Sequence, residues 1–278
     1  MSKPVALERN NMLFYISPSK TMKLTHMTAE AEGPFLLAKQ PAATLRTQLS
    51  KLSIDELKAF YKVSDKVAQT AYELLRVKET GAAIDLFEGL VFKNLSYNML
   101  DESDKSYLES HLIIGSALYG LVSPRQQIRP YRLDLDNPIT LEEQSLPQYW
   151  KKRVTMAMLK QPSKWIIDLA SEEYSQLLDL EKLNKGSSHR HNKKGNESLH
   201  QNQSYKQVIK IEFKERREGK LVNVATFSKM ARGQFLRQAA VMKVASPEDL
   251  KTIHVMGFAY DASQSTESIF CYVSNPQK

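Results

Sequence analysis

The sequence contains a single cysteine, Cys271, and no long hydrophobic run. One cysteine excludes a disulfide framework and argues against a cysteine-based metal site. No stretch approaches the roughly 18 apolar residues that a membrane-spanning helix needs. The start, MSKPVALERNNMLFYI, has Glu8 before a short apolar run, which does not fit a secretory signal. We therefore expect a cytoplasmic protein with no membrane partner, no bound metal and no cofactor.

The motifs of several common enzyme classes are also missing. The sequence has no phosphate-loop glycine pattern, no dinucleotide fingerprint, no His-Glu-x-x-His and no Gly-x-Ser-x-Gly. The one thiol, Cys271, lies in IFCYV, which is typical of a buried strand. An enzyme would have to use other groups. Lys20, Asp168 and Tyr131 are the candidates, although no spacing argument joins them.

Charge is the most informative part of the composition. The 278 residues are 42% hydrophobic and 25% charged, which suits a soluble globular protein of one large or two small domains. The net charge is +8. Residues 182–243 hold fifteen Lys or Arg and four Glu, a balance of +11, so the remainder carries −3. A local basic excess indicates a polyanion partner, and it equally fits a solubilising surface.

Residues 53–77 predict two short helices joined by a tight break, KVSDKVA. Ser53 and Glu56 form a capping box, the first helix is expected to break at Val63, and Ser64 can cap the second. Lys62 and Lys66 flank that helix start, where free backbone N–H groups suit a phosphate. The break is either a phosphate-binding hairpin or a solvated turn. The adjacent Asp65 would repel a phosphate, and the usual glycines of a helix-hairpin-helix are absent.

Strands and helices are expected to alternate elsewhere. MLFYI (12–16) predicts a buried strand that ends at Ser17-Pro18 and leaves Lys20 in a loop. Residues 165–178 predict a strand and then a helix capped by Ser171, with Asp168 as a buried carboxylate that needs a basic neighbour. Residues 103–118 predict a helix.

The basic segment predicts a β-hairpin followed by a helix. Residues 208–227 alternate like two strands with a turn at Glu218-Gly219, and Lys214 lies on the first strand. Residues 227–241 then predict a helix on which Lys229 and Arg232 share one face. Gly233 beside them would permit close approach of a ligand backbone.

Arginine and tyrosine alternate in LYGLVSPRQQIRPYRLDL. Arg125, Arg129 and Arg132 with Tyr119 and Tyr131 suit phosphate contact and base stacking. The other reading is that Tyr131 packs inside while the arginines pair with Asp134 and Asp136.

A polar stretch interrupts the chain at about 184–205 and is expected to be a mobile insertion. Its histidines, His189, His191 and His200, have no cysteine or carboxylate at a ligand spacing. We therefore interpret them as surface histidines and not as a metal site.

Taken in order, these landmarks resemble the bacterial peroxide-stress protein YaaA family. The resemblance runs from about Met12 to Tyr272. It rests on ISPSKT (16–21), SDKVA (64–68), FEGLVFKNL (87–95), LYGLVSPRQQIRPYRL (118–133), QYW (148–150), IDLASEEY (167–174), FKERREGK (213–220) and KMARGQF (229–235).

The resemblance implies one compact α/β domain over residues 1–278, with a mixed sheet, a helix-hairpin-helix element and a basic cleft. It also implies DNA binding and a role in limiting free iron during peroxide stress. The family's hairpin corresponds to residues 57–75, which favours the phosphate-binding reading of KVSDKVA. The chain departs from the family pattern at four positions, where it has Leu90, Ser123, Gln126 and Met230.

The function expected from the sequence is therefore phosphate-directed binding of double-stranded or distorted DNA by a monomer. The expected DNA contacts are Lys20, Lys62, Ser64, Lys66, Arg125, Arg129, Arg132, Lys214, Lys229 and Arg232. The alternatives are an enzyme that acts on a nucleotide or phosphorylated small molecule in the same cleft, and a plain interaction protein.

Overall fold

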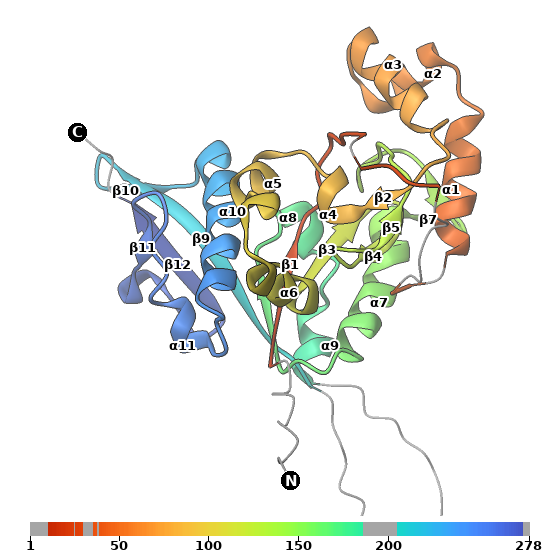
Figure 1. The fold of residues 1–278 in the computed structure, drawn as a ribbon. Coiled ribbons are helices and arrows are strands. Elements are labelled where there is room, and N and C mark those ends of the chain that lie inside the picture. Colours follow the sequence, from red (N-terminus) through yellow and green to blue (C-terminus); the bar gives the residue numbers. More distant parts are fainter. Residues whose placement is uncertain (1–10, 25, 30–35, 38, 186–204, 275–278) are drawn as a thin grey trace, which may run out of the picture.

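A mixed, mostly parallel β-sheet forms the centre of the fold (Figure 1). The computed structural model describes residues 11–24, 26–29, 36–37, 39–185 and 205–274. In these residues eight strands join in the order β11-β12-β9-β8-β1-β3-β4, with β10 beside β9. The strands are β1 (Met12–Ile16), β3 (Leu112–Ser116), β4 (Gly120–Val122), β8 (Trp165–Asp168), β9 (Gln207–Arg217), β10 (Lys220–Val222), β11 (Ala259–Tyr260) and β12 (Ile269–Ser274).

Parallel pairing brings several strand ends to one edge of the sheet. β1 pairs in parallel with β3 on one side and β8 on the other, and β8, β9 and β12 continue the parallel order. β4, β10 and β11 add antiparallel pairs. All five residues of β1 are buried, as their apolar run predicts for a strand covered on both faces. The α/β fold class is thus confirmed.

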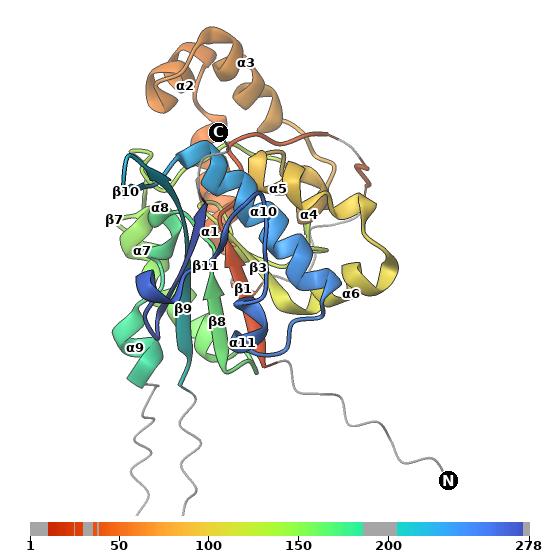
Figure 2. The same cartoon turned by 90° about the vertical axis from the view of Figure 1, so that its left-hand side faces the viewer.

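Helices cover both faces of the sheet. On one face α5, α6 and α10 pack together, and α7 and α9 lie on the other (Figures 1 and 2). The helices are α1 (Gln40–Ser50), α2 (Ile54–Tyr61), α3 (Asp65–Leu74), α4 (Ala83–Leu86), α5 (Leu90–Leu95), α6 (Glu102–His111), α7 (Leu146–Leu159), α8 (Glu172–Ser175), α9 (Leu180–Lys185), α10 (Ala225–Val241) and α11 (Pro247–Leu250), with 3-10 turns η1 (Tyr97–Met99) and η2 (Ala262–Gln264).

Two small antiparallel pairs complete the described elements. β2 (Gly81–Ala82) pairs with β5 (Gln127–Ile128), and β6 (Thr140–Leu141) pairs with β7 (Gln144–Ser145). No helix among the described residues is long and apolar enough to cross a membrane.

The helix pair α2 and α3 projects from the body of the molecule beyond α1 in both views (Figures 1 and 2). The capping box of Ser53 and Glu56 is present as predicted. The first helix ends at Tyr61, earlier than expected, because Lys62 adopts a left-handed conformation with φ 52°. Below, "the α2–α3 hairpin" means residues 54–74.

The predicted helix over 103–118 is wrong in its second half. α6 ends at His111, and Leu112–Ser116 form strand β3, which is fully buried between β1 and β4. The run LIIGS is apolar enough for a buried helix or a buried strand, and it forms a strand because it pairs with β1. Gly115 fits there because a Cβ would lie 2.8 Å from Tyr15 Oη and from Tyr174 Cδ1.

The β-hairpin and the following helix are confirmed. β9 and β10 pair antiparallel around Glu218 and Gly219, which both have positive φ, and α10 begins at Ala225. The expectation that Gly233 leaves room for a ligand is wrong. A Cβ on Gly233 would lie 2.1 Å from the carbonyl oxygen of Val91, so the glycine admits the backbone of α5.

We expect Gly233→Ala to lower the free energy of unfolding by about 3 kcal/mol, because the methyl group must push α5 away from α10. Gly219→Asn is the matched control, since Gly219 has φ 78° and open space around a Cβ, and asparagine tolerates that conformation. The control should change the free energy by less than about 0.5 kcal/mol. Urea unfolding of both variants tests this, and equal stability would contradict the close packing.

Candidate functional site: a strand-end cavity and a projecting hairpin

A cavity of about 310 Å³ opens beside the carboxyl ends of β1 and β8. In α/β sheets this edge is where ligands commonly bind. The loop after β1, the start of α5, the β8–α8 connection and α10 all contribute to its wall. Its polar residues include Ser17, Lys20, Asp134, Ser171, Glu173, Lys229 and Arg232. Its apolar residues are Pro18, Leu90, Val91, Phe92, Leu169 and Tyr174. We call it the strand-end cavity.

Three predicted DNA contacts meet in the strand-end cavity: Lys20, Lys229 and Arg232. Lys20 Nζ lies 3.1 Å from Asp134, and its side chain remains 62% exposed. Lys229 is exposed, and no ion pair involves it within the described part of the chain. Arg232 is partly buried, and its Nε has no hydrogen-bond partner among the described residues. The cavity therefore keeps positive charge that its own carboxylates do not pair.

A fourth predicted contact, Arg132, joins the cavity loop to the α2–α3 hairpin. Its Nη1 donates to the carbonyl oxygen of Lys20 at 3.2 Å. Its guanidinium carbon lies 5.6 Å from the centre of the Tyr61 ring, and the Tyr61 hydroxyl donates to the Arg132 carbonyl oxygen. Because Tyr61 is the last residue of α2, the turn end of α2 and the cavity loop share one side chain.

Asp168 lies behind the cavity as the buried carboxylate that the sequence predicts. Its Oδ1 accepts the N–H of Ala170 at 2.9 Å. Burial raises the pKa of Asp168, while the hydrogen bond from the Ala170 N–H and the charges of Lys210 and Arg232 oppose that rise. The expected basic neighbour is thus present.

Sequence reasoning named Asp134 only as a partner for the arginines and assigned no site role to Glu173. Glu173 accepts the N–H of Leu135 at 3.0 Å, and burial raises its pKa. Asp134, which holds Lys20, follows Arg132 by two residues. In an extended segment residues two apart point to the same side, so this spacing was the available signal.

The three catalytic candidates each have a different partner. Lys20 pairs with Asp134, Asp168 lies near Arg232, and Tyr131 shares a 2.8 Å hydrogen bond with Ser116. Tyr131 is 2% exposed, and burial raises its pKa, so its hydroxyl serves the core. A catalytic role for the three together stays a prediction.

The tip of the α2–α3 hairpin carries Lys62, Ser64 and Lys66, all exposed. Ser64 stands at the N-cap of α3, and its side chain makes no capping hydrogen bond within the described residues. Asp65, which would repel a phosphate, pairs with Lys58 at 2.7 Å, and that contact lowers the pKa of Asp65. The free N–H groups of the α3 start therefore face solvent beside two lysines.

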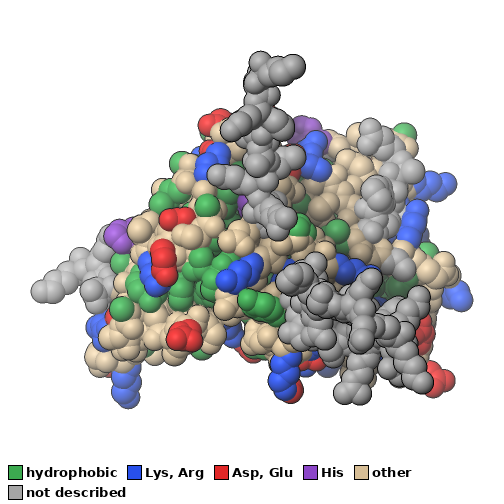
Figure 3. Space-filling model, turned by 90° about the horizontal axis from the view of Figure 1, so that it is seen from below, with side chains coloured by type: hydrophobic (Ala, Val, Ile, Leu, Met, Phe, Trp, Pro, Cys, Tyr) green, Lys and Arg blue, Asp and Glu red, His purple; other side chains and the backbone are tan. Residues whose placement is uncertain are grey.

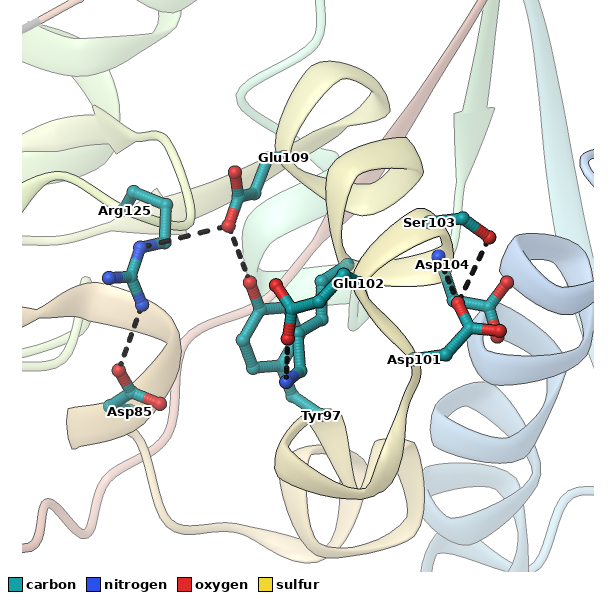
Figure 4. Close-up of polar contacts among 9 residues, drawn as sticks. Asp85, Tyr97, Asp101, Glu102, Ser103, Asp104, Glu109 and Arg125 are labelled. Atoms are coloured by element: carbon teal, nitrogen blue, oxygen red, sulfur yellow. Dashed lines mark hydrogen bonds and ion pairs between the residues drawn. The ribbon is translucent and has the colours of Figure 1, made fainter.

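Two other predicted contacts are paired with acids. Arg125 Nη1 lies 3.3 Å from Asp85 and its Nε lies 3.7 Å from Glu109, which also accepts a 2.6 Å hydrogen bond from Tyr97 (Figure 4). Lys214 lies 2.7 Å from Glu212 on the same strand. These pairs reduce the charge that either residue offers to a phosphate.

The last predicted contact, Arg129, lies in an open groove between α1 and the end of α3. Its charged lining residues are Arg46, Lys51, Arg76, Lys78 and Arg129, with no Asp or Glu among the described residues that line it. Arg46 fixes the groove, because it donates to the carbonyl oxygens of Leu75 at 3.1 Å and Pro130 at 2.7 Å. Sequence reasoning missed the other four residues, since they lie far apart along the chain. We call this the α1–α3 groove.

The face seen from below carries charges of both signs (Figure 3). In the view from below, positive and negative side chains are scattered among hydrophobic ones over the described part of the surface (Figure 3). No group of three or more His, Cys, Asp or Glu that could hold a metal ion occurs in the described ranges. The histidines of 184–205 lie outside the described residues.

Comparison with known proteins identifies relatives along nearly the whole chain. A family model described as "Peroxide stress protein YaaA" matches residues 12–264, a span that includes every residue of the strand-end cavity. A UPF0246 protein of Rickettsia rickettsii (strain Iowa) is 29% identical over 271 residues, covering 95% of this chain and 100% of the relative. A UPF0246 protein of Lacticaseibacillus paracasei is 29% identical over 273 residues with the same coverage.

We expect Arg232→Met to destabilise the fold by about 1–3 kcal/mol at pH 8 and by less at pH 5. Burial already raises the folded pKa of Asp168, and removing a nearby cation raises it further. The loss of stability is largest at pH values above the folded pKa, where Asp168 is charged. It becomes smaller as the pH falls toward the unfolded pKa of about 4.

Urea unfolding at the two pH values measures this effect. The double variant Asp168→Asn/Arg232→Met is the control, because it has no carboxyl group to titrate at this position. Its loss of stability should be the same at both pH values. A single variant that behaves like the double one would show that Arg232 does not face Asp168.

Proposed function

This chain belongs to the peroxide stress protein YaaA family, and from that membership we propose that it acts in the peroxide response by binding DNA. The bound protein would protect the DNA that it covers from iron-dependent damage. The contacts we propose are with phosphates. Such contacts position a protein without reading sequence. The affinity should therefore depend on the shape of the DNA, such as a bulge in a duplex, and not on its bases.

The observation that carries this proposal is the exposed, uncapped start of α3 between Lys62 and Lys66. A helix start offers N–H donors and the positive end of the helix dipole, and adjacent lysines add full charges. The α2–α3 hairpin also projects from the body, so a long rigid partner can reach it (Figure 2). The local acid, Asp65, is held by Lys58.

The α1–α3 groove supports the same proposal. It begins where α3 ends, and α3 has ten residues, so the two sites are about 15 Å apart along that helix. Phosphates on one strand are spaced more closely than this, and one duplex can contact both sites. The Tyr72 ring restrains the guanidinium of Arg76, whose central carbon lies 3.2 Å from the ring centre. A restrained guanidinium loses less freedom when it contacts a phosphate.

The remaining predicted contacts fall into two groups. Lys20, Arg132, Lys229 and Arg232 lie at or beside the strand-end cavity, which adjoins the turn end of α2 through Arg132. Arg125 and Lys214 are paired with carboxylates and would add less. We therefore assign the DNA contacts first to the hairpin tip and the groove.

The double variant Lys62→Ala/Lys66→Ala tests the proposal. Removing two phosphate contacts should weaken binding to plain and bulged duplexes alike and reduce the slope of log K against log salt by about 2. Fluorescence anisotropy across a salt series measures both. The double variant Lys151→Ala/Lys152→Ala is the matched control, since it removes two exposed lysines from α7. Equal salt slopes for the two double variants would rule out the hairpin as the phosphate contact.

A further inference from the structure

We propose that the strand-end cavity binds a small ligand with one phosphate group and a flat aromatic ring, the chemistry of a nucleoside monophosphate. This inference does not depend on the hairpin or on duplex binding. It rests on the size of the cavity, on cations that have no ion pair among the described residues, and on its apolar wall.

The cavity has the size of a small-ligand site. Its volume is about 310 Å³, at the lower end of the range of about 300–1,000 Å³ for ligand pockets. It lies at the carboxyl ends of parallel strands, where the backbone of an α/β sheet leaves room for a ligand. A duplex cannot enter such a space, whereas one nucleotide can.

The cations in the cavity lining favour an anion. Lys229 has no ion pair within the described residues, and the Nε–H group of Arg232 is buried without a partner there. A buried donor of this kind costs free energy until an acceptor fills the site. Lys20 is held by Asp134, so its position is fixed while its ammonium group keeps further donors. A phosphate oxygen would satisfy these donors with charge-assisted hydrogen bonds.

Another part of the cavity lining is apolar. Leu90 and Phe92 come from α5, Leu169 follows β8, and Tyr174 lies in α8. Aromatic and branched apolar side chains suit the faces of a flat ring. Leu90 is 37% exposed, so it lies where the cavity opens to solvent. The site has hydroxyl groups for a sugar as well, because Ser17 and Ser171 lie within 3.0 Å of each other on the same wall.

Isothermal titration of the full chain with dAMP, adenosine and inorganic phosphate tests the inference. We expect dAMP to bind, and adenosine and phosphate to bind at least about tenfold more weakly, because each lacks one half of the contacts. Lys229→Ala removes an exposed cation from the cavity lining, and Leu90→Trp adds bulk to its apolar part. Each should weaken dAMP binding by about tenfold or more. Lys220→Ala, an exposed lysine on β10, is the matched control and should leave it unchanged.

Absence of dAMP binding, or dAMP binding that neither Lys229→Ala nor Leu90→Trp weakens, would overturn the proposal. The nucleotide can be free or can be a unit turned out of a bulged duplex, and a bulge that contains 2-aminopurine distinguishes the two. A fluorescence change that Leu90→Trp abolishes identifies DNA as the source. A signal that does not change while dAMP still binds identifies the free nucleotide.

Discussion

The guanidinium of Arg132 is the contact on which the arrangement of both candidate sites depends. It donates to the Lys20 carbonyl oxygen in the cavity loop and lies over the ring of Tyr61 at the end of α2. The helix pair also buries Leu57, Tyr61 and Ala71 in the core cluster, and Arg132 adds a polar contact between the hairpin and the loop after β1. One side chain that contacts both parts fixes the hairpin beside the strand-end cavity. Lysine would not reproduce this contact, because its ammonium group is not planar and cannot stack on the ring while it donates to a carbonyl oxygen.

Ion pairs with carboxylates of the same protein decide which basic residues remain available to contact DNA. Arg125 and Lys214 are matched by carboxylates, and Lys58 is used to hold Asp65. Lys62 and Lys66 have no ion pair among the described residues, so their charge remains available. Net charge alone could not separate these groups. The total of +8 became informative only when each cation had been placed beside its neighbours.

Local sequence patterns predicted the helices and strands. The cavity could not be predicted in this way, because it forms only when distant segments assemble around the sheet. Caps and apolar runs located β1, α2, α3, β8 and α10 to within a few residues. The second half of the helix expected over 103–118 failed, because LIIGS pairs with β1 and no local signal reports that partner. Gly233 was assigned to a ligand because its real neighbour, Val91, is 142 residues away in sequence. Asp134 and Glu173 were missed as a pair for the same reason.

The most direct test of this account is backbone hydrogen–deuterium exchange with and without a bulged duplex. If the hairpin contacts DNA and Arg132 ties it to the cavity loop, exchange should slow over residues 62–68 and also over 17–20. The strands β11 and β12, at the far edge of the sheet, should not change. Slower exchange confined to those strands, or no change over 62–68 at a concentration that saturates binding, would contradict the account.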